Sequence, residues 1–147
     1  MPRIDVNIKR LDPTVELPSY AYEGDAGLDL RANETVDIPP HGRALVPTGL
    51  AIALPDGYAG FVQPRSGMAL KRGLSIANTP GLIDAHYRGE LKVIAVNLDP
   101  SEPIHIERGE RIAQLVIQEV PAVHLVEVDE LDQTDRGTGG FGSSGTV

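Results

Sequence analysis

Apolar and polar residues alternate over short stretches of this chain, and no stretch keeps a helical period for long. Ile4, Val6 and Ile8 alternate with polar neighbours, as in a half-buried strand. Further short apolar stretches predict strands over residues 44–54, 59–63, 74–78, 91–98, 112–118 and 123–128. The pattern favours only one helix, a short one over residues 66–71. We therefore expect an all-β fold.

Proline and glycine separate the predicted strands, with turn signals at residues 39–42, 55–57 and 108–110. Closely spaced strands of this kind are typical of an antiparallel barrel or sandwich. The run VIAV at residues 93–96 is apolar on both faces. It suits either a two-layer barrel or a strand with one face buried against another subunit. The apolar pattern stops near residue 130, which predicts a domain of residues 1–130 and a flexible, Gly-rich arm of residues 131–147.

Composition narrows the class of protein. The chain has 147 residues, of which 41% are hydrophobic and 23% charged, as in a soluble single domain. It contains no cysteine, which excludes disulfides and thiolate metal sites. The net charge of −8 argues against a nucleic-acid-binding surface. With no apolar run long enough for a membrane span and no signal-peptide pattern, we expect a cytoplasmic protein without a membrane partner.

The glycine-rich stretch RGTGGFGSSG covers residues 136–145. Gly137–Gly142 formally matches the dinucleotide fingerprint, but that motif needs a following helix for which the chain has no room. Ser143 stands where a P-loop requires lysine. Glycine amides, serine hydroxyls and Arg136 nevertheless suit a phosphate. From its own chemistry the stretch is either a phosphate-binding tail or a solvated linker.

Four further motifs combine glycine with charged residues: DAGLDL at 25–30, PRSGMA at 64–69, NTPGLIDAHYRGELK at 78–92 and RGERIAQL at 108–115. Arg65 and Ser66 open the predicted helix, where free amides favour a phosphate. Residues 78–92 read as a hairpin with Asp84 and Tyr87 near its bend. Each motif taken alone also has a structural explanation, as a turn, a cap, a surface ion pair or part of the core. The four histidines have no metal-ligand spacing.

Taken in order, the four motifs and the tail resemble the five motifs of the trimeric dUTPase family, over residues 25–145. The resemblance implies a jelly-roll-like β-barrel of the β-clip type and a homotrimer with active sites at the subunit junctions. It also implies Mg²⁺-assisted hydrolysis of dUTP to dUMP and pyrophosphate. That reaction limits uracil incorporation into DNA and supplies dUMP for dTMP synthesis.

The resemblance also implies roles for individual residues. Asp84 is the expected general base, and Asp29 is expected to order water around Mg²⁺. The expected phosphate ligands from the body are Arg65, Ser66, Gly67 and Gln114. The expected nucleoside contacts are Asn78, Leu82 and Ile83 for uracil, Tyr87 beneath the deoxyribose, and Lys92 close to the substrate.

The same resemblance makes the tail a lid that orders over bound substrate. Arg136 is expected to contact the γ-phosphate and Phe141 to stack on uracil, while Gly142, Ser143 and Ser144 wrap the phosphates. Two enzyme alternatives share the fold: dCTP deaminase and a bifunctional deaminase–dUTPase. A non-catalytic nucleotide sensor is the alternative from another class.

Overall fold

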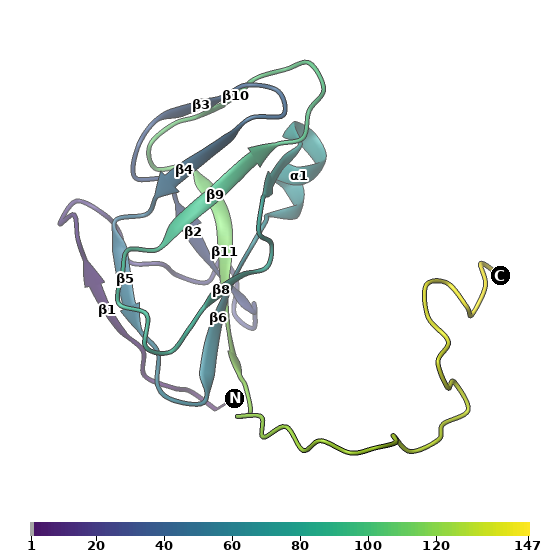
Figure 1. The fold of residues 1–147 in the computed structure, drawn as a ribbon. Helices are drawn as coiled ribbons and strands as arrows, with labels where there is room; N and C mark the ends of the chain where they lie inside the picture. The colour runs from purple at the N-terminus through teal and green to yellow at the C-terminus, as the bar shows by residue number, and fades with distance from the viewer. Residues whose placement is uncertain (1) are drawn as a thin grey trace.

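Short strands wrap around one aliphatic core in the computed structural model, which describes residues 2–147 (Figure 1). The elements in chain order are β1 (Asn7–Arg10), β2 (Gly27–Arg31), β3 (Val36–Ile38), β4 (Arg43–Pro47), β5 (Leu50–Ala53), β6 (Tyr58–Gln63), α1 (Ser66–Arg72), β7 (Leu74–Ile76), β8 (Gly81–Ile83), β9 (Lys92–Asn97), β10 (Ile104–Ile106) and β11 (Arg111–Glu119). The predicted all-β class and the single short helix are confirmed.

The strands form small antiparallel sheets. The largest has the order β2-β11-β6-β8, and a second has the order β4-β9-β7. Two-stranded pairs, β1-β5 and β10-β3, complete the arrangement. Every paired strand except β1 and β8 contributes residues to the shared core, which is built from leucine, isoleucine, valine and alanine, and Ile83 of β8 packs against it. The sheets therefore surround one common core, as in a barrel, and the core cluster of the described residues contains no aromatic side chain.

A turn at Thr48 and Gly49 interrupts the long apolar stretch that was predicted as one strand over residues 44–54. Gly49 has φ of +73°, a left-handed conformation that glycine adopts without strain. A Cβ at Gly49 would also lie 2.8 Å from Val15 Cγ2. The buried Thr48 hydroxyl donates to the Leu91 carbonyl over 2.6 Å. The stretch therefore forms two strands, β4 and β5, and its turn holds a distant segment.

The hairpin predicted over residues 78–92 is wrong. β8 pairs with β6, while β9 pairs with β4 and β7 in another sheet. The loop between β8 and β9 crosses from one sheet to the other because hydrogen bonds hold Leu91 at the Thr48 turn. The Leu91 carbonyl accepts from the Thr48 hydroxyl, and the Leu91 N–H donates to the Leu50 carbonyl. Asp84 and Tyr87 therefore lie in a crossing loop and not at the bend of a ribbon.

The strand predicted over residues 123–128 is also wrong. These residues have no regular structure, and Val123, Leu125 and Val126 are exposed. The alternation of apolar residues there finds no partner strand within residues 2–147. Three strands that the pattern did not predict, β2, β3 and β10, are only three to five residues long. Such short strands carry too few alternations to be recognised.

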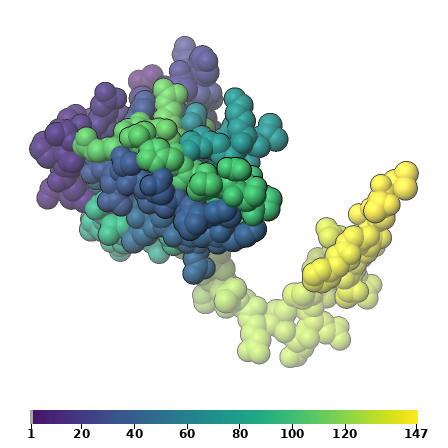
Figure 2. All heavy atoms as spheres, turned by 90° about the horizontal axis from the view of Figure 1, so that it is seen from above, coloured from purple at the N-terminus to yellow at the C-terminus, as the bar shows by residue number. Residues whose placement is uncertain are grey.

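The last strand ends at Glu119, and the chain then leaves the body (Figure 1). Figure 2 shows the residues beyond about 120 as an extended arm that leads away from the barrel. The domain boundary at residue 130 stays a prediction. In the described part of the chain, no helix has the length and apolar character needed to cross a membrane.

Asn97 is a fully buried polar residue at the end of β9. Its side-chain amide donates to the carbonyls of Ile38 (3.0 Å) and Glu102 (2.8 Å), and its oxygen accepts from the Asp99 N–H (2.8 Å). These bonds join β3, β9 and the segment that leads to β10. Buried polar groups without such partners are strongly destabilising.

We predict that Asn97→Ala lowers the free energy of unfolding by about 3 kcal/mol, because it leaves buried backbone groups unpaired. Urea unfolding at one fixed protein concentration measures the change. Asn7→Ala, on the exposed strand β1, is the matched control and should be close to the parent. Equal stability of the two variants would contradict the role given to Asn97.

A polar network joins the N-terminal segment to the turn before β11. Arg108 Nη2 lies 3.3 Å from Asp12 Oδ2 and donates to the Thr14 hydroxyl, while Asn33 also donates to Asp12. Hydrogen bonds from Thr14, then from Asn33, and the charge of Arg108 lower the pKa of Asp12 to about 2. Arg108, the first residue of the fourth motif, therefore connects the N-terminal segment to the barrel.

Because the pKa of Asp12 is lowered in the folded state, its carboxylate stabilises the fold fully at pH values above 3.8, the ordinary pKa of the group. This stabilisation is lost as the pH falls through about 2. We predict that Asp12→Asn makes the loss of stability between about pH 4 and pH 2 less steep. Thermal unfolding across that range measures the slope. The exposed Asp5→Asn variant is the control, and an identical slope in both variants would contradict the assignment.

Candidate active site

The connection from β6 to α1 places Arg65 beside Asp29 of β2. Arg65 Nε lies 3.5 Å from Asp29 Oδ1, and Arg65 Nη1 donates to the Arg111 carbonyl over 3.3 Å. Arg111 Nη1 lies 3.6 Å from the other Asp29 oxygen. The Asp29 side chain is only 11% exposed, so the two guanidinium groups compensate its charge where water is scarce. We call Asp29, Arg65, Arg111 and Gln114 the Asp29 cluster.

A β-bulge in β11 makes this cluster possible. The register between β2 and β11 shifts between Arg111 and Ala113. Because of the extra residue, Ile112 and Ala113 are both buried in succession, while Arg111 lies opposite Arg31. Gln114 then lies opposite Asp29 and packs over Gly27, where an added Cβ would lie 3.1 Å from Gln114 Cβ. The predicted residues Asp29, Arg65 and Gln114 are thus neighbours.

Ser66 and Gly67 form the exposed first turn of α1. Arg65 precedes the helix with extended backbone angles and makes no side-chain cap bond. The first turn contains no acidic residue, whereas Lys71 and Arg72 stand in the last turn. The amide end of the helix is therefore left without a negative side chain and faces solvent next to Arg65.

The predicted nucleoside contacts gather around β8. This strand ends its sheet, so one side of it has no partner strand in the described chain. Leu82 is 58% exposed, and the Asn78 amide lies near Gly81, where an added Cβ would be 3.3 Å from Asn78 Nδ2. Ile83 packs closely on Gly60. Lys92 is exposed at the start of β9, in the other sheet.

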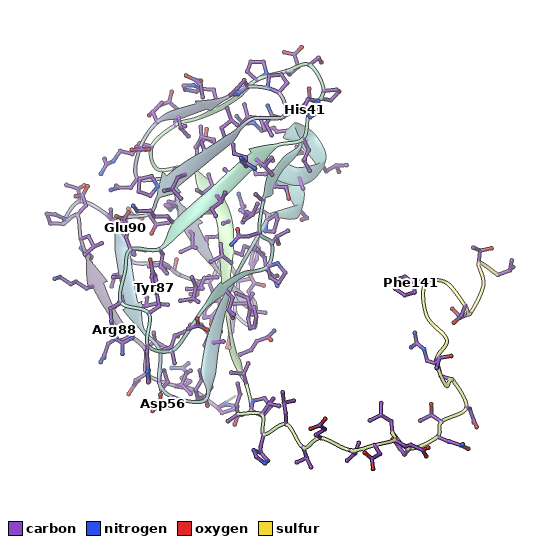
Figure 3. The ribbon with its side chains drawn as sticks, in the orientation of Figure 1. His41, Asp56, Tyr87, Arg88, Glu90 and Phe141 are labelled. Carbon is purple, nitrogen blue, oxygen red and sulfur yellow. The ribbon has the colours of Figure 1, made fainter. Side chains whose placement is uncertain are left out.

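Asp84 and Tyr87 lie in the crossing loop that follows β8. Both side chains are exposed, and the Tyr87 N–H donates to the Asp84 carbonyl over 3.1 Å. His86 Nε2 lies 2.7 Å from Asp56 Oδ1, which ties the loop to the turn before β6. Arg88 donates to the Ala85 carbonyl over 2.7 Å. Figure 3 shows Tyr87, Arg88 and Glu90 on the same side of the barrel.

Within one chain, the Asp29 cluster and Asp84 stand at different places on the largest sheet. Asp29 is on β2 at one edge, level with Gln63 of β6. Asp84 follows β8 at the opposite edge, where Ile83 pairs with Gly60. Standard strand dimensions separate the two carboxylates by roughly 14 Å across the sheet and roughly 13 Å along it. One copy therefore does not bring both groups to the same small ligand.

The arm is folded on itself but is not joined to the barrel. Arg136 Nε donates to the Gly139 carbonyl over 2.8 Å, and successive turns run from Thr134 to Gly145. Phe141 is fully exposed and lies far from Tyr87 (Figure 3). Within residues 2–147, no hydrogen bond or ion pair links residues 121–147 to the barrel. The predicted arm residues therefore contact neither the Asp29 cluster nor the residues around β8 and Asp84.

The described residues contain no cluster of three or more histidine, aspartate or glutamate side chains that could hold a metal ion. His105, the histidine with the most polar contacts, lies between Glu107 (2.7 Å) and Asp37 (2.5 Å). These two carboxylates raise the pKa of His105 above its ordinary value. The arrangement joins β10 to β3 and lies outside the five motifs, with Glu107 directly before the fourth.

Comparisons with known proteins give the family. The family described as dUTPase matches residues 14–145, which is most of the chain. The chain belongs to the dUTPase family. The deoxyuridine 5'-triphosphate nucleotidohydrolase of Thermobifida fusca is 57% identical over 142 residues, covering 97% of this chain and 79% of that protein.

Solved dUTPases share the fold. The dUTPase of Staphylococcus bacteriophage 80alpha with dUPNHPP has a TM-score of 0.88 at 33% identity, covering 97% of this chain and 99% of the other. A mutant dUTPase of phage phi11 of S. aureus, described with a structural Mg(II) ion, has a TM-score of 0.79 at 28% identity, covering 86% of this chain and 98% of the other. The predicted jelly-roll-like dUTPase fold is confirmed.

The structure adds residues to those predicted for this dUTPase. Arg111 joins the Asp29 cluster, although it stands within the fourth motif and received no role from the sequence. Asp56 contacts the third-motif loop through His86, but no spacing along the chain connects positions 56 and 86. Gly89 and Glu90 support Tyr87 and follow it after Arg88 in the third motif. Only Arg111 carried a usable signal, because a second arginine in a motif suits a phosphate.

Proposed function

We propose that this dUTPase hydrolyses dUTP to dUMP and pyrophosphate. The observation that carries the proposal is the combined placement of an exposed carboxylate after an edge strand and an arginine cluster on the same sheet, in a chain 57% identical to a dUTP nucleotidohydrolase. The carboxylate, Asp84, suits activation of water. The arginines suit an anion of high charge.

The Asp29 cluster and the first turn of α1 are the proposed triphosphate site. Arg65 and Gln114 supply side-chain donors, and Ser66 and Gly67 supply a hydroxyl and free amides. Nothing in the structure lies within 4 Å of the position that a Cβ on Gly67 would take, so phosphate oxygens can approach its backbone closely. Positive groups fixed before substrate arrives stabilise the charge that develops during phosphoryl transfer.

The exposed edge of β8 is the proposed uracil site. Backbone groups of Leu82 and Ile83, with the Asn78 amide, offer donors and acceptors to the base. Cytosine presents the opposite polarity at position 4 and would leave buried groups unpaired, which gives strong discrimination. Tyr87 packs beneath the deoxyribose and leaves no room for a 2′-hydroxyl group. Lys92 stays close to the substrate.

In the proposed reaction, Asp84 accepts a proton from water, and the water oxygen forms a bond to the α-phosphorus. The bond between the α-phosphorus and the bridging oxygen breaks, and pyrophosphate leaves. Arg65 and Arg136 offset the negative charge on the leaving group. Phe141 covers the base, while Gly142, Ser143 and Ser144 wrap the phosphates and exclude water.

The dUTPase family generally depends on a divalent metal, and we propose Mg²⁺ for this chain. The described residues form no cage of three carboxylates or histidines. That donor set fits a metal held mainly by phosphates and water. Asp29 suits an indirect role, because its oxygens lie 3.5 and 3.6 Å from guanidinium nitrogens and retain lone pairs for water. When bound, Mg²⁺ would neutralise phosphate oxygens.

We propose that the functional unit is a homotrimer with active sites at the subunit junctions. The separation of Asp84 from the Asp29 cluster across the largest sheet, and the lack of contact between Arg136 and the barrel in the described residues, support sites completed by different copies. Apolar side chains that a single copy leaves exposed, including Leu45, Leu82 and Leu125, support burial against neighbouring copies.

The proposed reaction removes dUTP from the pool used for DNA synthesis and forms dUMP, the precursor of dTMP. A cytoplasmic location remains our prediction. Neither deaminase alternative is favoured by the comparisons, and the complete set of motif residues with Asp84 speaks against a non-catalytic sensor. Release of ammonia from dCTP would favour the deaminase, whereas release of pyrophosphate from dUTP supports our proposal.

We predict that Asp84→Asn lowers kcat for dUTP by about a thousandfold, because amide nitrogen and oxygen cannot accept the proton from water. A pyrophosphate-release assay measures the loss. Asp5→Asn, an exposed substitution before β1, should retain parent activity and serves as the matched control. Parent-like turnover by Asp84→Asn would disprove the proposed mechanism.

We predict that deletion of residues 136–147 leaves the trimer intact and lowers kcat/KM at least about a hundredfold, the loss typical of removing a preorganised donor to the transition state. Light scattering reports the mass, and pyrophosphate release reports the activity. Deletion of residues 146–147 alone should be harmless. Full activity after the longer deletion would identify the arm as a linker, and a monomer of either form would contradict the proposed assembly.

A further inference from the structure

We propose that Gly89 and Glu90 are positioning residues that determine sugar specificity, because together they form a seat that fixes the Tyr87 ring. This inference rests on the proposed function, in which Tyr87 excludes a 2′-hydroxyl group. It extends that role to two residues that need not touch the substrate. The seat consists of the Gly89 Cα and the Glu90 carbonyl.

Gly89 has no room for a side chain as long as Tyr87 keeps its place. A Cβ built on Gly89 would lie 2.6 Å from Tyr87 Cζ and 2.8 Å from Cε1. Carbon atoms in van der Waals contact lie about 3.5 to 4.0 Å apart, so the ring and a Cβ cannot both occupy these positions. The backbone of Gly89 is not in the left-handed region. The requirement for glycine therefore comes from the Tyr87 ring alone.

Glu90 holds the hydroxyl end of the Tyr87 ring. The Tyr87 hydroxyl donates to the Glu90 carbonyl over 2.9 Å. The Glu90 carboxylate in turn accepts from the Gly49 N–H over 3.2 Å, and the next residue, Leu91, is bonded to Thr48. The seat is thus attached to the turn between β4 and β5. The position of Tyr87 is therefore tied through Glu90 to the barrel.

The remaining surface of Tyr87 is available to a ligand, since the residue is 44% exposed (Figure 3). A ring held at one place defines a fixed boundary for a sugar that packs on it. A single added hydroxyl group is rejected only if this boundary cannot yield. If the ring is pushed off its seat, the boundary moves and a ribose gains room, while the uracil and phosphate contacts are unchanged.

The test compares kcat/KM for dUTP and for UTP in the parent, Gly89→Ala, Tyr87→Ala and the double variant. We expect the dUTP/UTP ratio to fall about tenfold in Gly89→Ala, as for a poorly fitting group in a rigid pocket. In the Tyr87→Ala background, Gly89→Ala should cause no further change, because the ring on which it acts is gone. A second loss of the same size in the double variant would overturn the proposal.

Glu90 provides an independent test. Glu90→Ala removes the acceptor for the Gly49 N–H and should lower the dUTP/UTP ratio, whereas Glu90→Gln keeps an amide oxygen as acceptor and should restore it. Thermal unfolding of each variant separates a shifted ring from a disrupted barrel. Equal ratios in Glu90→Ala and the parent would overturn the role of Glu90, whether or not Gly89→Ala folds.

The outcomes also separate this inference from the function on which it rests. If the parent does not hydrolyse dUTP, the proposed function fails. If Tyr87→Ala keeps the parent ratio, the role of Tyr87 in sugar selection fails. If Tyr87→Ala loses the ratio but Gly89→Ala and Glu90→Ala both keep it, only the positioning role fails.

Discussion

The hydrogen bonds around the Thr48–Gly49 turn hold together parts of the chain that are distant in sequence. The buried Thr48 hydroxyl and the Gly49 N–H bind the segment at Glu90 and Leu91, and the Gly49 carbonyl accepts from Leu11. The left-handed backbone of Gly49 makes this geometry possible without strain. Because the turn lies between two core strands, it passes the rigidity of the core to the N-terminal strand and to the third-motif loop.

The largest sheet carries the two groups of proposed site residues near its opposite edges. At β2 and β11, the bulge directs Arg111 and Gln114 outward while Ile112 and Ala113 stay in the core. At β8, an edge strand leaves backbone groups and Asp84 open. A rigid sheet keeps these two half-sites apart in one copy, so the proposed chemistry needs assembly. Under the proposed trimeric assembly, dissociation would abolish turnover without unfolding the subunit.

Several features of the fold were predictable from local patterns. The helix at Ser66 and most strands follow from short apolar runs between glycine and proline turns, and the ordered motifs pointed to the dUTPase family. Other features depend on contacts between distant residues. No local signal shows that β8 pairs with β6 rather than β9, since the decisive bonds come from Thr48. The apolar residues at 123–128 misled the prediction, because alternation does not reveal whether a partner strand exists in the same chain.

The arm leaves the barrel after Glu119 and carries Arg136 and Phe141 on a long exposed spacer. Such a tether keeps Arg136 and Phe141 at an effective concentration on the order of millimolar near the proposed site. The proposed closure of the arm over bound substrate therefore does not need strong individual contacts. Under the same proposal, the arm would make fewer contacts with each product than with the intact triphosphate, so these contacts would break quickly after hydrolysis. A tethered arm of this kind would combine efficient closure with fast release, a balance that a tightly docked lid could not reach.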